Sequence, residues 1–419
     1  MAVDILARDA ADQARARLVS ARMGPALTSP SGLRRFRAAL DEALLKPAHI
    51  VCVGDSISEG VGVDDPSTII SYPNSDVYGW PGQLRTLFGR QYGVVDAGCL
   101  VPNTHGFADG RVALAGASAV STTGLMQSGS SVTATSNSGS PGTMTFNLPS
   151  CTGFDILYYK DAAALGAGTG GWTYKIDGGA PVVGENDGLS AAPGGYKMIP
   201  VTGLAQGAHS VVVTATSANP AYIFGVRYHS GVGACVTRFA KAGGILLDVF
   251  GLGHAFPGNN TAVGNNAAAA RLAGGFGAWA PHLTIIAFAY NDWLGQNDTL
   301  TSGLNAGPAV YQQYLQTAVN RIAAAGGCAL LLGEPYAPSA TTPAGGADYA
   351  SYLAAMKTVA QTTDHVAALF VTDFWRSAAD AVALGLHASS SSIHPSRRGH
   401  GSIGRMIHSA IGQPGIFGV

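Results

Sequence analysis

The fold of this chain is indicated by residues 49–60, which read HIVCVGDSISEG. Residues 49–53 form a short, largely β-branched apolar run, which is typical of a central strand in a parallel sheet. The run stops at Gly54, and Asp55 and Ser56 follow at once. Ligands of open α/β sheets bind at the carboxyl ends of the strands, so Ser56 stands where a nucleophile would act if a histidine reached it. A plain strand-to-turn junction would also explain these residues, because Gly, Asp and Ser are common in turns.

Composition limits the classes of protein to consider. The chain has 419 residues, of which 47% are hydrophobic and 12% charged, so it is globular and long enough for two domains. Its net charge of −1, without a basic stripe, argues against nucleic acid or an anionic membrane surface as partner. The five cysteines include no C-x-x-C pair, and Cys52, Cys235 and Cys328 lie in apolar runs, as small core residues do. We expect no metal site, no disulfide framework and no cofactor.

The sequence also gives an expectation about location. Its N-terminus lacks the apolar stretch of a signal peptide, and no segment is long and apolar enough to span a bilayer. We therefore expect a cytoplasmic protein, a protein exported by another route, or a component of a particle such as a virion.

Two patterns divide the chain. Residues 47–110 and 232–419 alternate short apolar runs with amphipathic segments, which predicts a doubly wound parallel sheet. Its five strands are expected near residues 49–53, 235–240, 283–288, 328–332 and 368–372. Helices are expected over residues 8–22, 31–45, 80–88, 266–279, 309–325, 349–361 and 376–384. Residues 1–46 form a separate N-terminal helical segment in this prediction.

Residues 111–231 have a different texture. Helical periodicity is absent, and short alternating segments appear near residues 131–135, 143–148, 154–159, 172–177 and 209–215, separated by glycine-containing turns. Many short strands with such turns predict an antiparallel β-sandwich, inserted into the α/β domain. Its aromatic residues would stack on sugar rings if they were exposed, although most aromatics of a sandwich are core: Tyr158, Tyr159, Trp172 and Tyr174.

The carboxyl ends of the predicted strands carry the parts of a serine hydrolase. The first strand gives Ser56, the second Gly243 and Gly244, and the third Asn291, whose amide can donate a hydrogen bond. His394, after the last strand, can act as the base, and Pro395 keeps it extended. Each has a plainer interpretation: a tight turn for the glycines, a helix N-cap for Asn291-Asp292, and one of eleven histidines for His394. Their order along successive strand ends favours catalysis.

The chain resembles the SGNH hydrolases, the GDSL-type esterase superfamily. The resemblance lies in Gly54-Asp55-Ser56, in Ala289-Tyr290-Asn291-Asp292, where Ala replaces the usual first Gly, and in His394-Pro395-Ser396. It covers residues 47–100 and 232–412. It implies a three-layer, flavodoxin-like fold, with Ser56 as nucleophile and His394 as base. It also implies an oxyanion hole made of the Ser56 N–H, Asn291 and one glycine, either Gly244, which we prefer, or Gly98 or Gly243.

The sequence departs from this superfamily at Ser391, where an aspartate three residues before the histidine is usual. Three interpretations stay open. A backbone carbonyl, for instance that of Ser391, orients His394 in a Ser–His dyad; another carboxylate, Asp373 or Asp380, takes the role; or the site is impaired. We favour the dyad, and we assign Asp55 and Asp292 to structural hydrogen bonds.

The resemblance implies a carboxylic ester hydrolase that works through an acyl-enzyme without a metal or organic cofactor. Because some relatives carry such an insert, the expected substrate is an O-acetylated polysaccharide or another short-chain acyl ester. The first alternative is a binding protein that recognises a glycan or cell surface, such as a phage tail component, on an inactive scaffold. The second is a lipase or thioesterase, which would need a long apolar acyl channel.

Overall fold

The computed structural model describes most of the chain, and its described residues are 27–63, 74–92, 98–100, 103–104, 107–108, 110–116, 118–121, 131–134, 141–160, 171–185, 195–216, 221–240, 246, 281–294, 307–337, 342, 346–375, 377–387, 389 and 392–412. The predicted helices at 8–22 and 266–279 lie outside these residues. No helix within the described ranges is long and apolar enough to cross a membrane.

A six-stranded sheet forms the centre of the α/β part, with strand order β1-β19-β18-β17-β2-β16. Its strands are β1 (Leu27–Thr28), β2 (Ala48–Gly54), β16 (Ala234–Ala240), β17 (Leu283–Ala287), β18 (Cys328–Gly333) and β19 (Val366–Phe370). The five predicted strands are all present and pair in parallel. In chain order they run 2-1-3-4-5, the arrangement of flavodoxin-like sheets.

The prediction of a purely parallel sheet was wrong at one edge. There, β1 pairs antiparallel with β19, Leu27 opposite Leu369 and Thr28 opposite Ala368. The sheet is therefore mixed. This two-residue strand occupies the unpaired backbone groups of β19, which would otherwise form an exposed edge. Periodicity did not reveal it because two residues carry no pattern.

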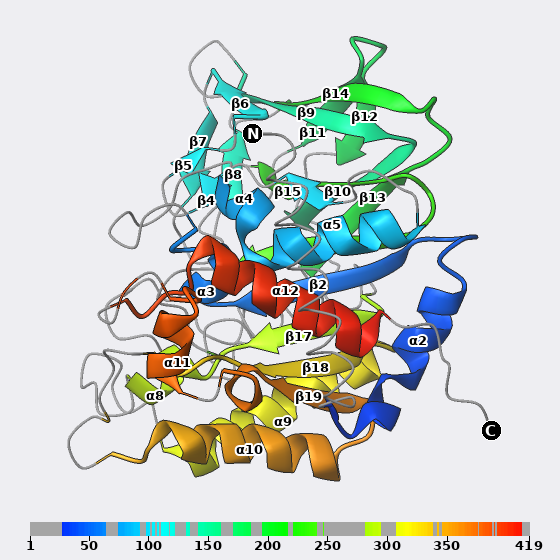
Figure 1. The fold of residues 1–419 in the computed structure, drawn as a ribbon. Coiled ribbons are helices and arrows are strands. Elements are labelled where there is room, and N and C mark those ends of the chain that lie inside the picture. The colour runs from blue at the N-terminus through cyan, green and yellow to red at the C-terminus, as the bar shows by residue number, and fades with distance from the viewer. Residues whose placement is uncertain are drawn as a thin grey trace, which may run out of the picture.

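Helices cover both faces of this sheet, because side chains alternate along each strand. Val51 and Val53 of β2 belong to one hydrophobic cluster, and Ile50 and Cys52 to the other. The first cluster includes α9 (Pro308–Ala324) and α10 (Tyr349–Thr362), and the second includes α2 (Arg34–Asp41), α5 (Trp80–Tyr92) and α12 (Arg397–Ile411). Figure 1 shows α9 and α10 on one side of the sheet and α5 and α12 on the other.

The remaining short elements connect these layers. The predicted helix over residues 31–45 is divided into a 3₁₀ turn, η1 (Pro30–Leu33), and α2. The predicted helix at 376–384 is present as α11 (Ala378–Ala383). Sequence periodicity did not reveal four other short helices: α3 (Ser56–Glu59), α4 (Asn74–Tyr78), α8 (Tyr290–Leu294) and η3 (Val371–Asp373). All five cysteines are buried and free.

Two antiparallel sheets are built mainly from residues between β2 and β16. One has the order β13-β10-β15-β8-β7, with β3 also on β15, and the other has the order β12-β11-β14-β9-β6. Their strands are β3 (Gly98–Leu100), β6 (Val112–Ala115), β7 (Ser118–Ser121), β8 (Ser131–Ala134), β9 (Thr143–Cys151), β10 (Gly153–Lys160), β11 (Trp172–Ile176), β12 (Val182–Glu185), β13 (Gly195–Val201), β14 (Gly207–Ala215) and β15 (Ala221–His229). Phe146 and Trp172 of the second sheet share one hydrophobic cluster with Phe154 and Tyr228 of the first.

That shared cluster corrects one expectation about the insert. Tyr158, Trp172 and Tyr174 are 7%, 1% and 7% exposed, so they fill the core between the two sheets. Tyr158 and Trp172 meet edge to face at 5.1 Å between ring centroids. These three side chains therefore cannot stack on a sugar ring. The side chain of Tyr159 lies outside the described part of the chain.

Candidate active site

The turn after β2 is shaped by close backbone packing. A Cβ on Gly54 would lie 2.1 Å from Ser58 Oγ and 2.8 Å from Ala287 O, so only glycine fits there. Asp55 caps α3, and its Oδ1 accepts a hydrogen bond from the Ile57 N–H at 2.9 Å. Ser56 is the first residue of α3 and is partly exposed. The local sequence thus presents the Ser56 hydroxyl at the carboxyl edge of the sheet.

His394 reaches this hydroxyl from the far end of the chain. The distance between Ser56 Oγ and His394 Nε2 is 2.9 Å. In the tautomer with its proton on Nδ1, the imidazole accepts the hydrogen bond that the Ser56 hydroxyl donates. A serine with a histidine nitrogen at this distance has the geometry of a nucleophile and its general base.

The loop after α3 holds the histidine segment in place. A Cβ on Gly62, whose φ is +93°, would meet Pro395 O at 2.5 Å and His394 Cβ at 3.0 Å. The Val61 carbonyl lies 2.9 Å from His400 Nε2, and the Val63 carbonyl accepts a hydrogen bond from Arg397 Nε at 3.4 Å. The start of α12 is therefore tied to the segment that follows Ser56.

Two more residues fix the backbone of His394. Ser392 Oγ donates to the His394 carbonyl at 2.9 Å, and the His394 N–H donates back to Ser392 Oγ at 3.2 Å. His387 Nδ1 lies 3.0 Å from the same carbonyl. Burial, and to a smaller extent the neighbouring His387, lower the pKa of His394 to about 4. The imidazole is therefore neutral at physiological pH, as a general base must be.

Asn291 is brought to the same corner by α8. Its Nδ2 donates to Asp55 Oδ2 at 3.3 Å, so the side-chain amide lies beside the residue that precedes Ser56. Glu334, directly after β18, contacts Asp55 as well, and its Oε2 accepts from the Tyr290 N–H at 3.4 Å. Asn291 is thus hydrogen-bonded to Asp55, the chain neighbour of Ser56, and the Ser56 hydroxyl contacts His394.

Of the three glycines considered for the oxyanion hole, the structure describes only Gly98. Gly243 and Gly244 lie outside the described residues. Leu246, two positions after Gly244, has its N–H bound to both carboxylate oxygens of Asp292, at 3.3 and 3.1 Å. Gly98 lies in β3, where a Cβ would meet Arg85 Nη1 at 2.9 Å and Tyr228 Oη at 3.0 Å.

None of the candidates for orienting His394 is seen to hydrogen-bond to its ring among the described residues. Ser391 lies outside the described residues. Asp373 is exposed in η3, Asp380 lies in the first turn of α11, and neither makes a hydrogen bond to His394. Among the described residues, the only hydrogen bond of the His394 ring is the one to Ser56.

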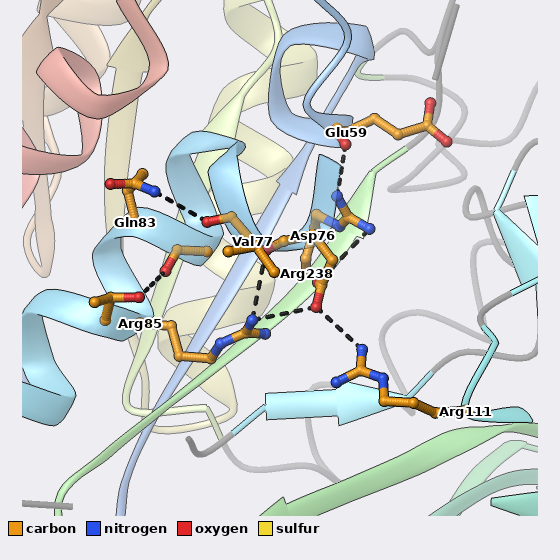
Figure 2. Close-up of polar contacts among 9 residues, drawn as sticks. Glu59, Asp76, Val77, Gln83, Arg85, Arg111 and Arg238 are labelled. Carbon is orange, nitrogen blue, oxygen red and sulfur yellow. Dashed lines mark hydrogen bonds and ion pairs between the residues drawn. The ribbon is translucent and has the colours of Figure 1, made fainter. Parts of the chain in front are cut away.

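A buried carboxylate with three arginines lies next to this site, and Figure 2 shows it in close-up. Asp76 Oδ2 lies 3.2 Å from Nη2 of Arg85 and 3.2 Å from Nη2 of Arg111, and its Oδ1 lies 3.8 Å from Nη2 of Arg238. Arg238 Nη1 also donates to the carbonyl of Glu59, the last residue of α3, at 2.5 Å. Because Arg111 immediately precedes β6, the cluster connects the antiparallel sheets with the helix that carries Ser56.

Several residues of the site were missed by sequence reasoning. Glu334 could have been found, because it follows the predicted strand at 328–332 as directly as Asp55 follows the first strand. Asp76, Arg238 and His387 carried no such signal, because their roles come from residues distant in the sequence.

The chain is similar to known ester hydrolases in sequence and in fold. Residues 216–401 match the GDSL-like Lipase/Acylhydrolase family. No curated protein matches the sequence. A solved peptidoglycan O-acetylesterase is similar in fold, with a TM-score of 0.63 and 15% identity over 92% of this chain and 98% of that chain.

Two smaller similarities have TM-scores of 0.24 and 0.23. The first is to a two-domain esterase active on acetylated mannans, at 16% identity over 29% of this chain and 35% of that chain. The second is to a family 35 carbohydrate binding module from Clostridium thermocellum, at 18% identity over 29% of this chain and 94% of that chain.

The family match over residues 216–401 supports an acyl ester hydrolase, and the solved structure shares the fold. The resemblance to the SGNH, or GDSL-type, hydrolases found in the motifs is confirmed by this match.

Proposed function

We propose that this protein is a serine esterase that hydrolyses carboxylic esters through an acyl-enzyme. The observation that carries the proposal is the 2.9 Å distance between Ser56 Oγ and His394 Nε2. Ser56 attacks the ester carbonyl while His394 takes its proton, and the imidazolium then protonates the leaving alcohol. Water, deprotonated by His394, releases the acid and restores Ser56.

The oxyanion of the tetrahedral intermediate requires donors that point at it. We assign this role to the Ser56 N–H, the Asn291 amide and the N–H of Gly244. Gly244 is preferred to Gly98 because Asp292, next to Asn291, binds the N–H of Leu246 shortly after Gly244. Gly98 instead packs against Arg85 and Tyr228.

We further propose a Ser–His dyad, in which a backbone carbonyl such as that of Ser391 orients the imidazole. Two facts support it: Asp373 is exposed and makes no hydrogen bond to His394, and no carboxylate among the described residues is responsible for the pKa of His394.

For the substrate, we propose an O-acetyl group on a polysaccharide. The similarity in fold to a peptidoglycan O-acetylesterase extends over 92% of this chain, so it includes the antiparallel sheets as well as the α/β part. We assign residues 47–110 and 232–419 to the hydrolase domain, and residues 111–231 to an inserted β-sandwich that binds the glycan chain.

Acetate release from O-acetylated peptidoglycan and O-acetylated xylan, compared with hydrolysis of p-nitrophenyl acetate, butyrate and decanoate, tests this assignment. We expect acetate to be the preferred acyl group and at least one glycan to be deacetylated. Preference for decanoate would indicate a lipase or thioesterase, and binding to a glycan without any hydrolysis would indicate a binding protein.

Because His394 stays neutral down to low pH, activity should persist to a lower pH than in an enzyme whose histidine has an ordinary pKa. Because the pKa of His394 is lowered to about 4, protonation removes the base only at low pH. The value of kcat/KM for p-nitrophenyl acetate should stay level from about pH 7 down to about pH 5 and halve near pH 4. Circular dichroism at each pH controls for unfolding. A half-maximal rate near pH 6.5 would contradict the buried environment described for His394.

Removing the Asn291 amide should destabilise the transition state and therefore lower kcat. Asn291→Ala is expected to lower kcat about 10²- to 10³-fold with little change in KM, the usual effect of removing one oxyanion donor. Asn320→Ala is the matched control, because Asn320 is exposed on α9 and, among the described residues, its side chain hydrogen-bonds only Gln316. Equal activity of both variants would remove Asn291 from the oxyanion hole.

A further inference from the structure

The backbone of the proposed base is bound by two side chains that lie outside the reacting pair. Ser392 Oγ accepts a hydrogen bond from the His394 N–H at 3.2 Å and donates one to the His394 carbonyl at 2.9 Å. His387 Nδ1 lies 3.0 Å from the same carbonyl. Because a carbonyl oxygen only accepts hydrogen bonds, Nδ1 of His387 carries a proton and donates it. Both backbone polar groups of His394 are therefore bound by side chains.

The two side chains are themselves buried and fixed. His387 is 2% exposed and Ser392 is 6% exposed. The His387 ring meets the Trp375 ring edge to face, at 5.4 Å between ring centroids, and the Ser392 N–H donates to the carbonyl of Ser389 at 3.2 Å. Hydrogen bonds in such a buried environment are strong, because water does not compete for them. The donors thus have a fixed place from which to hold the His394 backbone.

The segment that carries His387 is also paired with the segment that follows His394. His387 and Pro395 form an antiparallel bridge. The Ser396 N–H donates to the carbonyl of Leu386 at 2.8 Å. The donor of His387 is therefore brought to the His394 carbonyl by backbone pairing, and it does not depend on a flexible side chain reaching across a gap.

The position of the imidazole depends on this backbone. Within the described ranges, the ring of His394 is hydrogen-bonded only to Ser56. On the other side of the segment, a Cβ on Gly62 would lie 3.0 Å from His394 Cβ, so the backbone of Gly62 packs closely against it. A displacement of about 1 Å between reacting groups can lower a rate about 100-fold. Release of the His394 backbone would allow such a displacement of Nε2 from the Ser56 hydroxyl.

We propose that His387 and Ser392 are positioning residues that clamp the backbone of His394, so that the base is oriented through its own peptide groups and stays on Ser56. The inference rests on the proposed esterase activity for its kinetic consequence. The state of the His394 ring can be measured without that activity.

Two substitutions at His387 separate hydrogen-bond donation from packing. His387→Asn keeps an N–H near the place of Nδ1 but removes the ring, and kcat for p-nitrophenyl acetate should stay within about threefold of the wild type. His387→Phe keeps a ring against Trp375 but removes the donor, and kcat should fall about 10-fold with KM nearly unchanged. His408→Phe is the matched control, because His408 also meets an aromatic ring, Phe88 at 4.9 Å, and hydrogen-bonds Gln91 at 2.8 Å. This control should keep the wild-type rate.

A substitution at Ser392 tests the other half of the clamp. Ser392→Ala removes both hydrogen bonds of the hydroxyl and should also lower kcat about 10-fold with KM nearly unchanged. The double variant His387→Phe/Ser392→Ala should lose about 100-fold, because nothing then binds the His394 carbonyl from this side. Thermal melting identifies any variant that does not fold, and the single variants at the two positions test the clamp independently.

Nitrogen NMR spectroscopy of the imidazole rings gives the readout that needs no activity. In the wild type, Ser56 donates to Nε2 of His394, so the ring proton stays on Nδ1 and the two ring nitrogens should have widely separated chemical shifts. In the double variant the ring should leave Ser56 and exchange its proton between both nitrogens, so the two shifts should converge. His387→Asn should keep the wild-type shifts, and His394→Gln assigns the signals.

The outcomes decide the inference separately from the function. If His387→Phe keeps the wild-type kcat, or if His387→Asn loses as much activity as His387→Phe, donation by His387 does not position the base. Unchanged His394 shifts in the double variant would overturn the clamp as well. If the wild type hydrolyses no ester but the shifts converge in the double variant, the clamp stands and the proposed function fails.

Discussion

Ser56→Ala is expected to lower kcat for p-nitrophenyl acetate by about 10⁴- to 10⁶-fold, the range found when the nucleophile of a serine hydrolase is removed. The reason is geometric. His394 Nε2 lies 2.9 Å from Ser56 Oγ, and no other hydroxyl among the described residues contacts this ring nitrogen. Residual hydrolysis would come from the oxyanion donors alone. The measurement is the initial rate after subtraction of spontaneous hydrolysis.

Ser351→Ala supplies the matched control, because Ser351 lies in the first turn of α10 and, within the described ranges, its side chain hydrogen-bonds only Asp348. It should retain full activity. Thermal melting should show that Ser56→Ala is folded, since Ser56 is only partly buried and the cap of α3 is made by Asp55. Equal rates for Ser56→Ala and the wild type would eliminate the esterase assignment altogether.

Asp76→Asn is expected to destabilise the fold by about 3–5 kcal/mol, the typical cost of removing one partner from a buried ion pair. Asp76 is 7% exposed as a side chain and is the shared counter-charge of Arg85, Arg111 and Arg238. An amide cannot balance three guanidinium charges. Chemical denaturation at pH 7 measures the loss, and Asp41→Asn, at an exposed position at the end of α2, should change stability by less than about 0.5 kcal/mol.

The stability that Asp76→Asn loses should decrease as the pH is lowered. Burial alone would raise the pKa of Asp76, but the charges of Arg85, Arg238 and Arg111 outweigh it and hold the pKa well below its usual range. The ionised carboxylate therefore contributes fully above pH 4, and its contribution is lost as the pH falls below that. The difference between Asp76→Asn and the wild type should shrink in acid. A difference below 1 kcal/mol at pH 7 would show that the arginines are balanced by other groups.

The same cluster predicts how the insert and the hydrolase domain are coupled. Arg111 stands at the start of the antiparallel sheets, while Arg238 binds the last carbonyl of α3. Asp76 lies between them, as Figure 2 shows. A loss of Asp76 should therefore loosen the nucleophile helix along with the packing of β6, and kcat of any folded Asp76→Asn protein should fall too.

The α/β part was predictable because its signals are local. The apolar runs that became β2, β17 and β18 are buried on both faces, so they read as continuous hydrophobic strands. A Cβ on residue 54 would lie 2.1 Å from Ser58 Oγ, so packing requires glycine there, and the Gly-Asp-Ser order marks the strand end. The edge strand β1 was not predicted, because a strand of two residues shows no periodicity.

By itself, the sequence predicted the five parallel strands and their ends, because strand periodicity and turn chemistry depend on neighbouring residues. It also pointed to Ser56, Asn291 and His394 as candidate catalytic residues. Only the tertiary structure decided that burial raises the pKa of Asp55 and Glu334 and that Asp76 is the shared counter-charge of three arginines. Protonation and ion pairing depend on burial and on distances between segments remote in the chain, and neither quantity exists until the chain has folded.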